Sequence, residues 1–240
     1  RNFESKGLTA GMLIQPSFLG TDNSFMIEAI DAYPTKLYGV AVVEPTISFE
    51  ELQALSTHNI VGIRLNLYGV DAPDLLSAEY QKLLGYLKQL DWHMELHTDA
   101  INLKNFIEPI LDAGVKVVVD HWGKPTADNP LEDEGFNYLL SIGITKQVWV
   151  KISGVYRLKK GGDFNTCKQL ASMMLPSLLD SFGPERLLWG SDWPHTNYEE
   201  PIDYDVTWNA FVEMVPEENI RQLILGESFE QLLPSSLIVE

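Results

Sequence analysis

The chain has 240 residues, of which 45% are hydrophobic and 21% are charged, a composition typical of a globular protein with a large apolar core. Thirty-four acidic residues against 17 basic ones give a net charge of −17, which argues against nucleic acid or an anionic membrane surface as a partner. Two small domains could fit in this length, but single α/β barrels routinely reach it, so a single domain over residues 1–240 is predicted.

Cysteine content and hydropathy predict the cellular setting. The single Cys167 excludes an internal disulfide and is consistent with a reducing compartment, so a cytoplasmic protein is predicted. No apolar run is long enough to span a bilayer, and no signal-peptide pattern is present. The chain does not begin with Met. A homodimer stays open, because no single stretch argues for it.

Seven short β-rich runs alternate along the chain with amphipathic helical patterns. The β-rich runs cover residues 11–15, 37–44, 61–67, 92–97, 115–121, 148–153 and 186–189. The helical patterns cover residues 25–30, 48–55, 75–90, 103–113 and 136–141, a stretch that ends near Phe182, and residues 220–233. The alternation predicts βα units and a parallel sheet. The acidic residues of the loop at 128–134 are predicted to lie on the surface.

Three patterns favour a closed barrel over an open doubly wound sheet. No Gly-rich phosphate-binding loop follows any β-rich run, so the usual reason for a doubly wound sheet is missing. In residues 61–67 the apolar side chains alternate with Arg64 and Asn66, which gives the strand one polar face. Polar side chains also end many of the runs: Gln15, Glu44, Arg64, Asn66, His97, His121, Ser153 and Asp192.

A (β/α)8 barrel places its active site at the carboxyl ends of its strands, which is where these polar residues fall. The predicted fold class is therefore α/β, a (β/α)8 TIM barrel. Such a barrel needs eight strands, whereas the sequence supplies seven. Only about ten residues precede the first run, too few for another βα unit. We therefore expect the first barrel strand to lie N-terminal to Arg1.

The stretch from Glu185 to His195 contains the strongest catalytic signal. An apolar run ending at Trp189 leads directly into Gly190, Ser191 and Asp192. A buried strand needs no acid, so Asp192 either acts as a general base or serves as a cap or ion-pair partner.

Four histidines are candidates for further roles. His121 follows an uninterrupted valine run, and a catalytic or ligand role competes there with that of a core imidazole. His97 shares a strand face with Glu95 and could simply pair with it. His93 on the same face is predicted to be structural. His195 is predicted to contact substrate, with a supporting position behind the contact residues or a surface position as the alternatives.

Two basic residues are expected on polar strand faces. Arg64 must meet an anion there, either a substrate carboxylate or a buried acid such as Glu44. Lys151 faces inward by alternation and could pair with Asp120 or Asp192.

Six motifs occur in order along the chain: QPSFLGTDN (15–23), GIRLNL (62–67), ELHTD (95–99), VVDHWGKP (118–125), VWVKISGVYRL (148–158) and LLWGSDWPH (187–195). Together they resemble the amidohydrolase-2 family of TIM-barrel hydrolases, and within it the branch of 2-pyrone-4,6-dicarboxylate lactonases. The resemblance implies catalytic positions on the fifth, sixth and eighth barrel strands, here His97, His121 and Asp192. The family's His-x-His pair on the first strand is absent from this sequence.

The activity implied is hydrolysis of a small carboxylated lactone without a cofactor. Asp192 would take a proton from water, while His121 and His97 polarise the carbonyl that the water attacks. Arg64 and Arg157 would bind a substrate carboxylate, although Arg157 could also be a solvated loop residue. The full set of expected substrate-binding residues is Arg64, Arg157, Tyr156, Ser153, Lys151, Gln15, Ser17, Asn66 and His195.

Three alternatives stay open at this point. A metal-dependent amidohydrolase or non-oxidative decarboxylase of the same family would bind one divalent ion, Zn or Mn, through His97, His121 and Asp192. A binding or scaffold protein built on an incomplete barrel is the non-enzymatic alternative. A nucleotide-binding α/β protein is the weakest, for want of a phosphate loop.

Overall fold

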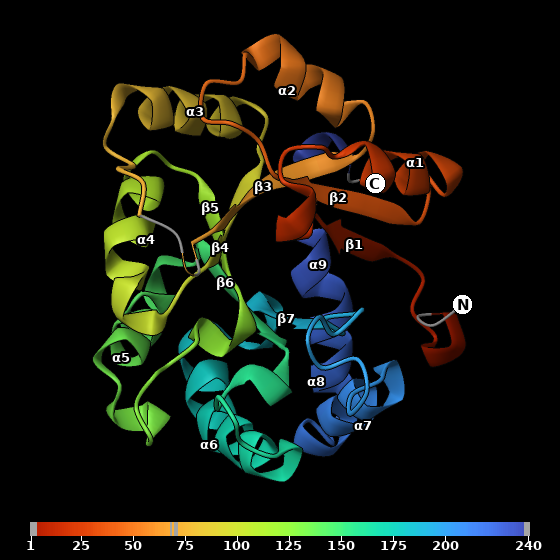
Figure 1. The fold of residues 1–240 in the computed structure, drawn as a ribbon, viewed down its shortest axis with the longest axis vertical. Helices are drawn as coiled ribbons and strands as arrows, with labels where there is room; N and C mark the ends of the chain where they lie inside the picture. Colours follow the sequence, from red (N-terminus) through yellow and green to blue (C-terminus); the bar gives the residue numbers. More distant parts are fainter. Residues whose placement is uncertain (1–3, 68, 70–71, 238–240) are drawn as a thin grey trace. The chain divides into compact units, whose positions relative to one another are not determined.

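The computed structural model describes residues 4–67, 69 and 72–237. Within these residues, one sheet contains seven strands that follow one another in chain order (Figure 1). The strands are β1 (Gly11–Ile14), β2 (Leu37–Ala41), β3 (Ile60–Asn66), β4 (His93–His97), β5 (Lys116–Val119), β6 (Val148–Ser153) and β7 (Leu187–Gly190). Every β-rich run predicted from the sequence is confirmed as a strand. β2 and β5 are shorter than expected, since β2 ends at Ala41 and β5 at Val119.

Helices separate the strands. They are α1 (Ser24–Ala32), α2 (Phe49–Ser56), α3 (Ala78–Gln89), α4 (Leu103–Asp112), α5 (Glu134–Ser141), α6 (Phe164–Phe182), α7 (Tyr204–Met214), α8 (Glu218–Gln222) and α9 (Ser228–Glu230). The predicted helix over residues 220–233 is divided by a π-helical turn at Leu223–Glu227. Helix α7 was not predicted, although Asp203 caps it by accepting a hydrogen bond from the backbone N–H of Val206 at 2.7 Å.

The first compact unit contains residues 1–96, 106–117 and 232–240. In it β1, β2 and β3 pair in parallel, with Gly11 opposite Leu37 and Gly39 opposite Ile60. Gly39 allows close packing, because a Cβ there would lie 2.5 Å from Cδ1 of Ile60. Asn23 exchanges hydrogen bonds of 2.9 and 3.1 Å with the backbone of Val42, so its side chain extends the pairing beyond the end of β2.

The second compact unit contains residues 97–105 and 118–231. β6 and β7 pair in parallel and end together, with Ser153 opposite Gly190. Helix α7 packs against β7 through aromatic contacts, since the ring of Trp189 lies 5.1 Å from that of Trp208 and 5.6 Å from that of Phe211. These contacts fix the end of β7, from which the chain continues to Asp192.

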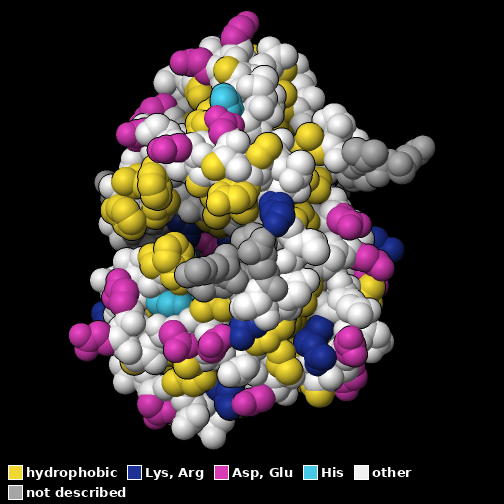
Figure 2. All heavy atoms as spheres, turned by 90° about the vertical axis from the view of Figure 1, so that its right-hand side faces the viewer, with side chains coloured by type: hydrophobic (Ala, Val, Ile, Leu, Met, Phe, Trp, Pro, Cys, Tyr) yellow, Lys and Arg dark blue, Asp and Glu magenta, His cyan; other side chains and the backbone are white. Residues whose placement is uncertain are grey.

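The distribution of charged side chains and the hydropathy of the helices are both consistent with the sequence. Acidic side chains are scattered over the face drawn in Figure 2, where Lys and Arg side chains are fewer. Among the described residues, no helix combines the length and the apolar character needed to cross a membrane.

Asp133 corrects the prediction of a wholly exposed acidic loop. Its side chain is buried, with 6% exposed, and its carboxylate accepts hydrogen bonds from the backbone N–H groups of Thr126, Ala127 and Phe136 at 2.9 to 3.1 Å. Burial alone would raise the pKa of Asp133, but these hydrogen bonds outweigh it and lower the pKa below its ordinary value of 3.8. The carboxylate therefore caps α5 and closes the preceding loop.

We expect Asp133→Ala to lower the free energy of unfolding at pH 7 by about 2 kcal/mol, the upper end for loss of an N-cap, because three N–H groups lose their acceptor. The folded-state pKa is depressed, so this contribution is present above pH 3.8 and is lost as the pH falls through the folded value. Denaturant unfolding at pH 7 and pH 3 measures both effects. Asp163→Ala, which removes the exposed cap of α6, is the matched control and should cost less. An equal loss in the two variants would contradict the assignment.

Candidate functional site

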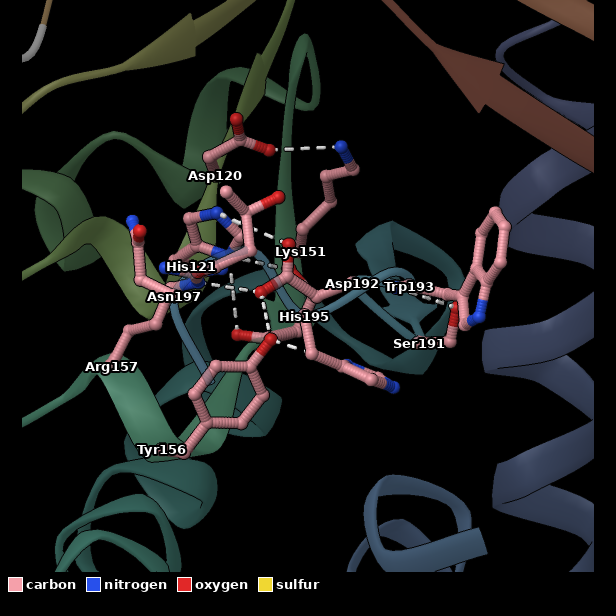
Figure 3. Close-up of polar contacts among 12 residues, drawn as sticks. Asp120, His121, Lys151, Tyr156, Arg157, Ser191, Asp192, Trp193, His195 and Asn197 are labelled. Carbon is pink, nitrogen blue, oxygen red and sulfur yellow. Dashed lines mark hydrogen bonds and ion pairs between the residues drawn. The ribbon is translucent and has the colours of Figure 1, made fainter. Parts of the chain in front are cut away.

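Asp192 lies at the centre of a polar cluster in the second unit (Figure 3). It follows the end of β7 in a left-handed conformation, with φ of 58°. Its Oδ2 accepts a hydrogen bond of 2.5 Å from the Tyr156 hydroxyl and one of 2.6 Å from Nε of Arg157. The strand-end position predicted for Asp192 is thus observed, and so is the ion pair that was its alternative role.

The electrostatics of the cluster keep Asp192 ionised. Burial would by itself raise the pKa of this carboxyl group. The charges of His121 and Arg157, with the hydrogen bonds from Tyr156 and Arg157, outweigh burial and hold the pKa below its ordinary value of 3.8. Asp192 is therefore a carboxylate at any pH near neutrality.

Arg157 and Tyr156 are both directed at Asp192. Besides its bond to Asp192, Arg157 donates from Nη2 to the Thr196 carbonyl at 3.1 Å, and its guanidinium lies 5.0 Å from the Tyr156 ring and 5.3 Å from the Tyr198 ring. Burial and the Asp192 charge raise the pKa of Tyr156, so its hydroxyl stays protonated and acts as a donor. The alternative of a solvated Arg157 is not what the structure shows.

His121 begins a left-handed turn that sequence reasoning placed in a strand. β5 ends at Val119, and four consecutive residues then have positive φ: His121 (47°), Trp122 (63°), Gly123 (76°) and Lys124 (47°). Left-handed geometry costs roughly 1–2 kcal/mol for each non-glycine residue. Backbone hydrogen bonds of 3.0 Å from Gly123 to Asp120 and from Lys124 to His121 close the turn. Strain of this kind is often found at functional sites, because the surrounding structure must hold it.

The turn directs the His121 ring towards three partners. Nδ1 of His121 lies 3.0 Å from the Ser153 hydroxyl, and its ring meets the ring of His97 edge-on at 5.0 Å. Nε2 lies 4.0 Å from Oδ1 of Asp192, which is wider than a hydrogen bond. The structure thus brings His97, His121 and Asp192, the predicted catalytic residues, into one cluster.

Two lysines line the cluster, each with an acidic partner. Lys151 donates to Asp120 at 2.8 Å, one of the two partners predicted for it. Lys124 lies 3.2 Å from Asp99. Burial lowers the pKa of Lys124 although Asp99 opposes the shift. Sequence reasoning did not single out Lys124, and its place three residues after His121 in the turn was the available signal.

Gly154 is a second site residue that sequence reasoning missed. It follows β6 with φ of 59°, and a Cβ there would lie 2.9 Å from both Oδ2 of Asp192 and Nδ1 of His121. Only glycine leaves room for both groups at this left-handed position. A Gly directly after a strand with a polar face was the signal that could have found it.

His195 is buried beside Tyr156 rather than placed on the surface, and only 3% of the residue is exposed. Its Nδ1 is 3.3 Å from the Tyr156 hydroxyl, and its backbone N–H donates to the Asp192 carbonyl at 2.8 Å. The peptide between Trp193 and Pro194 in this turn is cis. The surface alternative for His195 is excluded.

The remaining predicted contacts belong to the first unit. Nε of Arg64 lies 3.1 Å from the buried Glu95, so Glu95 rather than Glu44 meets the need for a buried acid. The Gln15 amide is fully buried and donates to the carbonyls of Gly20 and Asp22 at 3.1 and 2.7 Å. Ser17 is exposed and Asn66 is half-buried. Their roles as substrate contacts stay predictions.

The metal-ligand set suggested by the resemblance does not fit the arrangement observed. Across residues 4–67, 69 and 72–237, no three His, Cys, Asp or Glu side chains are grouped so as to hold a metal ion. Oδ2 of Asp192 is bound by Tyr156 and Arg157.

Comparisons with known proteins add a family and a fold. A family model described as Amidohydrolase matches residues 5–232. The chain is 27% identical over 231 residues to a 4-sulfomuconolactone hydrolase from Rhizobium radiobacter, across 94% of this chain and 75% of that protein. It is 28% identical over 230 residues to a 2-pyrone-4,6-dicarboxylate hydrolase from Comamonas testosteroni, across 92% and 75%.

A solved structure from Acinetobacter baumannii extends the likeness to three dimensions. That protein, taken to be a 2-pyrone-4,6-dicarboxylic acid hydrolase and solved with citric acid bound, is 36% identical, with a TM-score of 0.91 over 96% of this chain and 85% of that one. The expected α/β fold of the TIM-barrel hydrolases is confirmed, with seven strands in the described residues.

The role of Gly154 can be tested by Gly154→Ala. The added methyl group must displace Asp192 or His121, and a misplacement of about 1 Å at reacting groups lowers turnover on the order of 100-fold. Steady-state kinetics on a carboxylated lactone measures the loss. Gly161→Ala is the matched control, because Gly161 has φ of 73° but a Cβ there meets nothing within 4 Å. Equal activity in the two variants would show that the space at Gly154 is not needed.

Proposed function

Because this chain belongs to the amidohydrolase family and is a hydrolase of the lactonase type, we propose that it opens a small carboxylated lactone related to 2-pyrone-4,6-dicarboxylate. Asp192 acts as the general base that activates water. The similar proteins support the substrate class, since both curated relatives are named for lactones with acidic substituents. The citric acid bound to the Acinetobacter protein supports a site that accepts polycarboxylates.

The geometry of Asp192 is the observation that carries the proposal. Tyr156 and Arg157 hold Oδ2, while Oδ1 lies 4.0 Å from Nε2 of His121. A gap of this width between two polar atoms suits a bridging water molecule. We place the attacking water there. Its proton passes to Asp192 as its oxygen forms a bond to the lactone carbonyl carbon.

The charges around Asp192 determine how much its basicity can contribute to lowering the activation barrier of hydrolysis. A depressed pKa keeps the carboxylate ionised but makes it a weak base, at a cost of about 1.4 kcal/mol for each pKa unit. Stabilisation of the developing oxyanion must therefore supply much of the acceleration. His121 holds the other side of this water through Nε2, and His97, whose ring meets that of His121 edge-on, polarises the lactone carbonyl in this mechanism. Collapse of the tetrahedral intermediate breaks the ring C–O bond, and the proton held by Asp192 goes to the leaving oxygen.

Substrate binding requires cations in a protein of net charge −17, whose overall field repels anions. Arg157 lies at the cluster and is 22% exposed in its side chain. We propose that a substrate carboxylate meets the edge of the Arg157 guanidinium that does not face Asp192. Lys151, Ser153 and Tyr156 complete the set of proposed contacts in the second unit.

The proposed reaction needs no cofactor. The metal-dependent hydrolase or decarboxylase is the alternative, and the chelator experiment below distinguishes the two.

We also propose that the chain forms one domain and acts in the cytoplasm. A single domain over residues 1–240 is supported by a family match that runs through both compact units. A cytoplasmic location is supported by the single Cys167.

Asp192→Asn is expected to lower kcat on 2-pyrone-4,6-dicarboxylate by about 1,000-fold or more, because the amide cannot accept a proton from water. Activity of the wild-type protein is expected to persist after treatment with a chelator. Asp128→Asn is the control, since Asp128 is 97% exposed and pairs only with the surface Lys159. Turnover by Asp192→Asn near the wild-type rate would refute the base assignment. Chelator-sensitive turnover with a stoichiometric divalent ion would support the metal-dependent alternative instead.

The pH dependence of kcat/KM follows from the depressed pKa of Asp192. The base is active when ionised, so the rate should fall on the acid side only below pH 3.8. Arg157→Met removes a charge that lowers this pKa, and the acid limb should therefore move to higher pH. A wild-type acid limb between pH 6 and 7, unmoved by Arg157→Met, would assign the titration to another group.

A further inference from the structure

The hydroxyl of Tyr156 lies between two possible hydrogen-bond acceptors. Oδ2 of Asp192 is 2.5 Å away and Nδ1 of His195 is 3.3 Å away. A phenol is neutral near pH 7 and has a single proton to donate. That proton goes to Asp192, because the contact is shorter and the acceptor is charged. The contact with His195 is then favourable only if Nδ1 of His195 donates to the Tyr156 oxygen.

The other ring nitrogen of His195 supports the same assignment. Nε2 is buried and has no hydrogen-bond partner among the residues that the structure describes. A proton on Nε2 would leave a buried donor unsatisfied, and a ring protonated on both nitrogens would add a buried charge. A bare Nε2 leaves only an acceptor without a partner, which proteins tolerate more often than an orphaned donor. The neutral tautomer protonated on Nδ1 is therefore favoured by both nitrogens.

We propose that His195 is a positioning residue for Asp192 that acts through Tyr156: the Nδ1–H of His195 directs the Tyr156 oxygen so that its hydroxyl proton points at Asp192. This inference rests on the proposed role of Asp192 as base. It assigns His195 no contact with substrate, in place of the contact predicted from the sequence. The edge-on contact of the two rings, 5.9 Å apart at 79°, fits a donor in the plane of the imidazole.

The backbone holds His195 in the required place. Its N–H donates to the Asp192 carbonyl at 2.8 Å, and its carbonyl accepts from the backbone N–H of Tyr198 at 2.7 Å. The imidazole is thus attached to the same short turn as the carboxylate that it influences. Tyr156 comes from the segment after β6, so His195 links the ends of two neighbouring strands.

The tautomer can be measured without any assay of activity. The chain contains five histidines, so long-range ¹H–¹⁵N correlation spectra of the imidazole rings are simple, and the His195 signals are those lost in His195→Gln. We expect the ring protonated on Nδ1 at pH 7. A ring protonated on Nε2, or on both nitrogens, would overturn the proposal. This readout stays informative even if the proposed lactonase activity fails.

Kinetics test whether His195 acts through Tyr156. His195→Asn places an amide N–H near the position of Nδ1, whereas the longer His195→Gln does not. We expect His195→Gln to lower kcat about tenfold, the rate equivalent of one hydrogen bond, with KM unchanged, and His195→Asn to retain most of the activity. Thermal unfolding of both variants checks that they are folded.

A double-mutant cycle completes the test. If His195 acts only through the Tyr156 oxygen, His195→Gln should cause no further loss of kcat in a Tyr156→Phe background. A tenfold loss in both backgrounds would overturn the proposal, as would a rise in KM alone, which is the signature of a substrate contact. His58→Gln is the matched control, because the exposed His58 pairs with Asp31 on the surface, away from the site.

Discussion

The pairing of Asp192 with Arg157 and Tyr156 is the interaction on which the site depends. A largely buried carboxylate is costly unless its charge is balanced, and here two short hydrogen bonds of 2.6 and 2.5 Å to Oδ2 balance it. Because both donors contact the same oxygen, the carboxylate has a fixed direction, with Oδ1 on the side of His121. Tyr156 and Arg157 follow β6 and Asp192 follows β7, two neighbouring parallel strands that end in register. The register of β6 and β7 thus determines where the proposed base points.

Backbone strain is concentrated around this pair. Asp192, His121, Lys124 and Gly154 all have positive φ, although only one of them is glycine. Such positions are costly, and they persist because the packing around them has no alternative. A left-handed turn brings His121 out of the line of β5, and the glycine after β6 leaves the space that the imidazole and the carboxylate share. These strained positions lower the stability of the fold, and they bring the Asp192 carboxylate within 4.0 Å of the His121 imidazole, a gap that the proposed water molecule can bridge.

Periodicity predicted the strands well, because buried parallel strands are short apolar runs and every one of the seven stood out. It also predicted that Asp192, His121 and His97 would cluster, since the carboxyl ends of parallel strands lie on one edge. It failed for α7, whose buried face of Thr207, Ala210 and Phe211 includes a polar residue, and for Asp133, where backbone donors rather than other side chains satisfy the buried charge. Periodicity also could not predict which residues form ion pairs with each other. Arg64 pairs with Glu95 on β4 rather than with Glu44, a choice made by the packing of side chains across the sheet.

We propose that Asp192 activates a water molecule rather than attacking the lactone itself. Hydrolysis of 2-pyrone-4,6-dicarboxylate in H₂¹⁸O, with enzyme in excess so that each molecule turns over once, tests this directly. If Asp192 acts as a base, one ¹⁸O atom should enter the newly formed carboxylate of the product and none should enter the protein. Unlabelled product, together with ¹⁸O in the peptide that contains Asp192, would show that Asp192 instead forms a covalent intermediate.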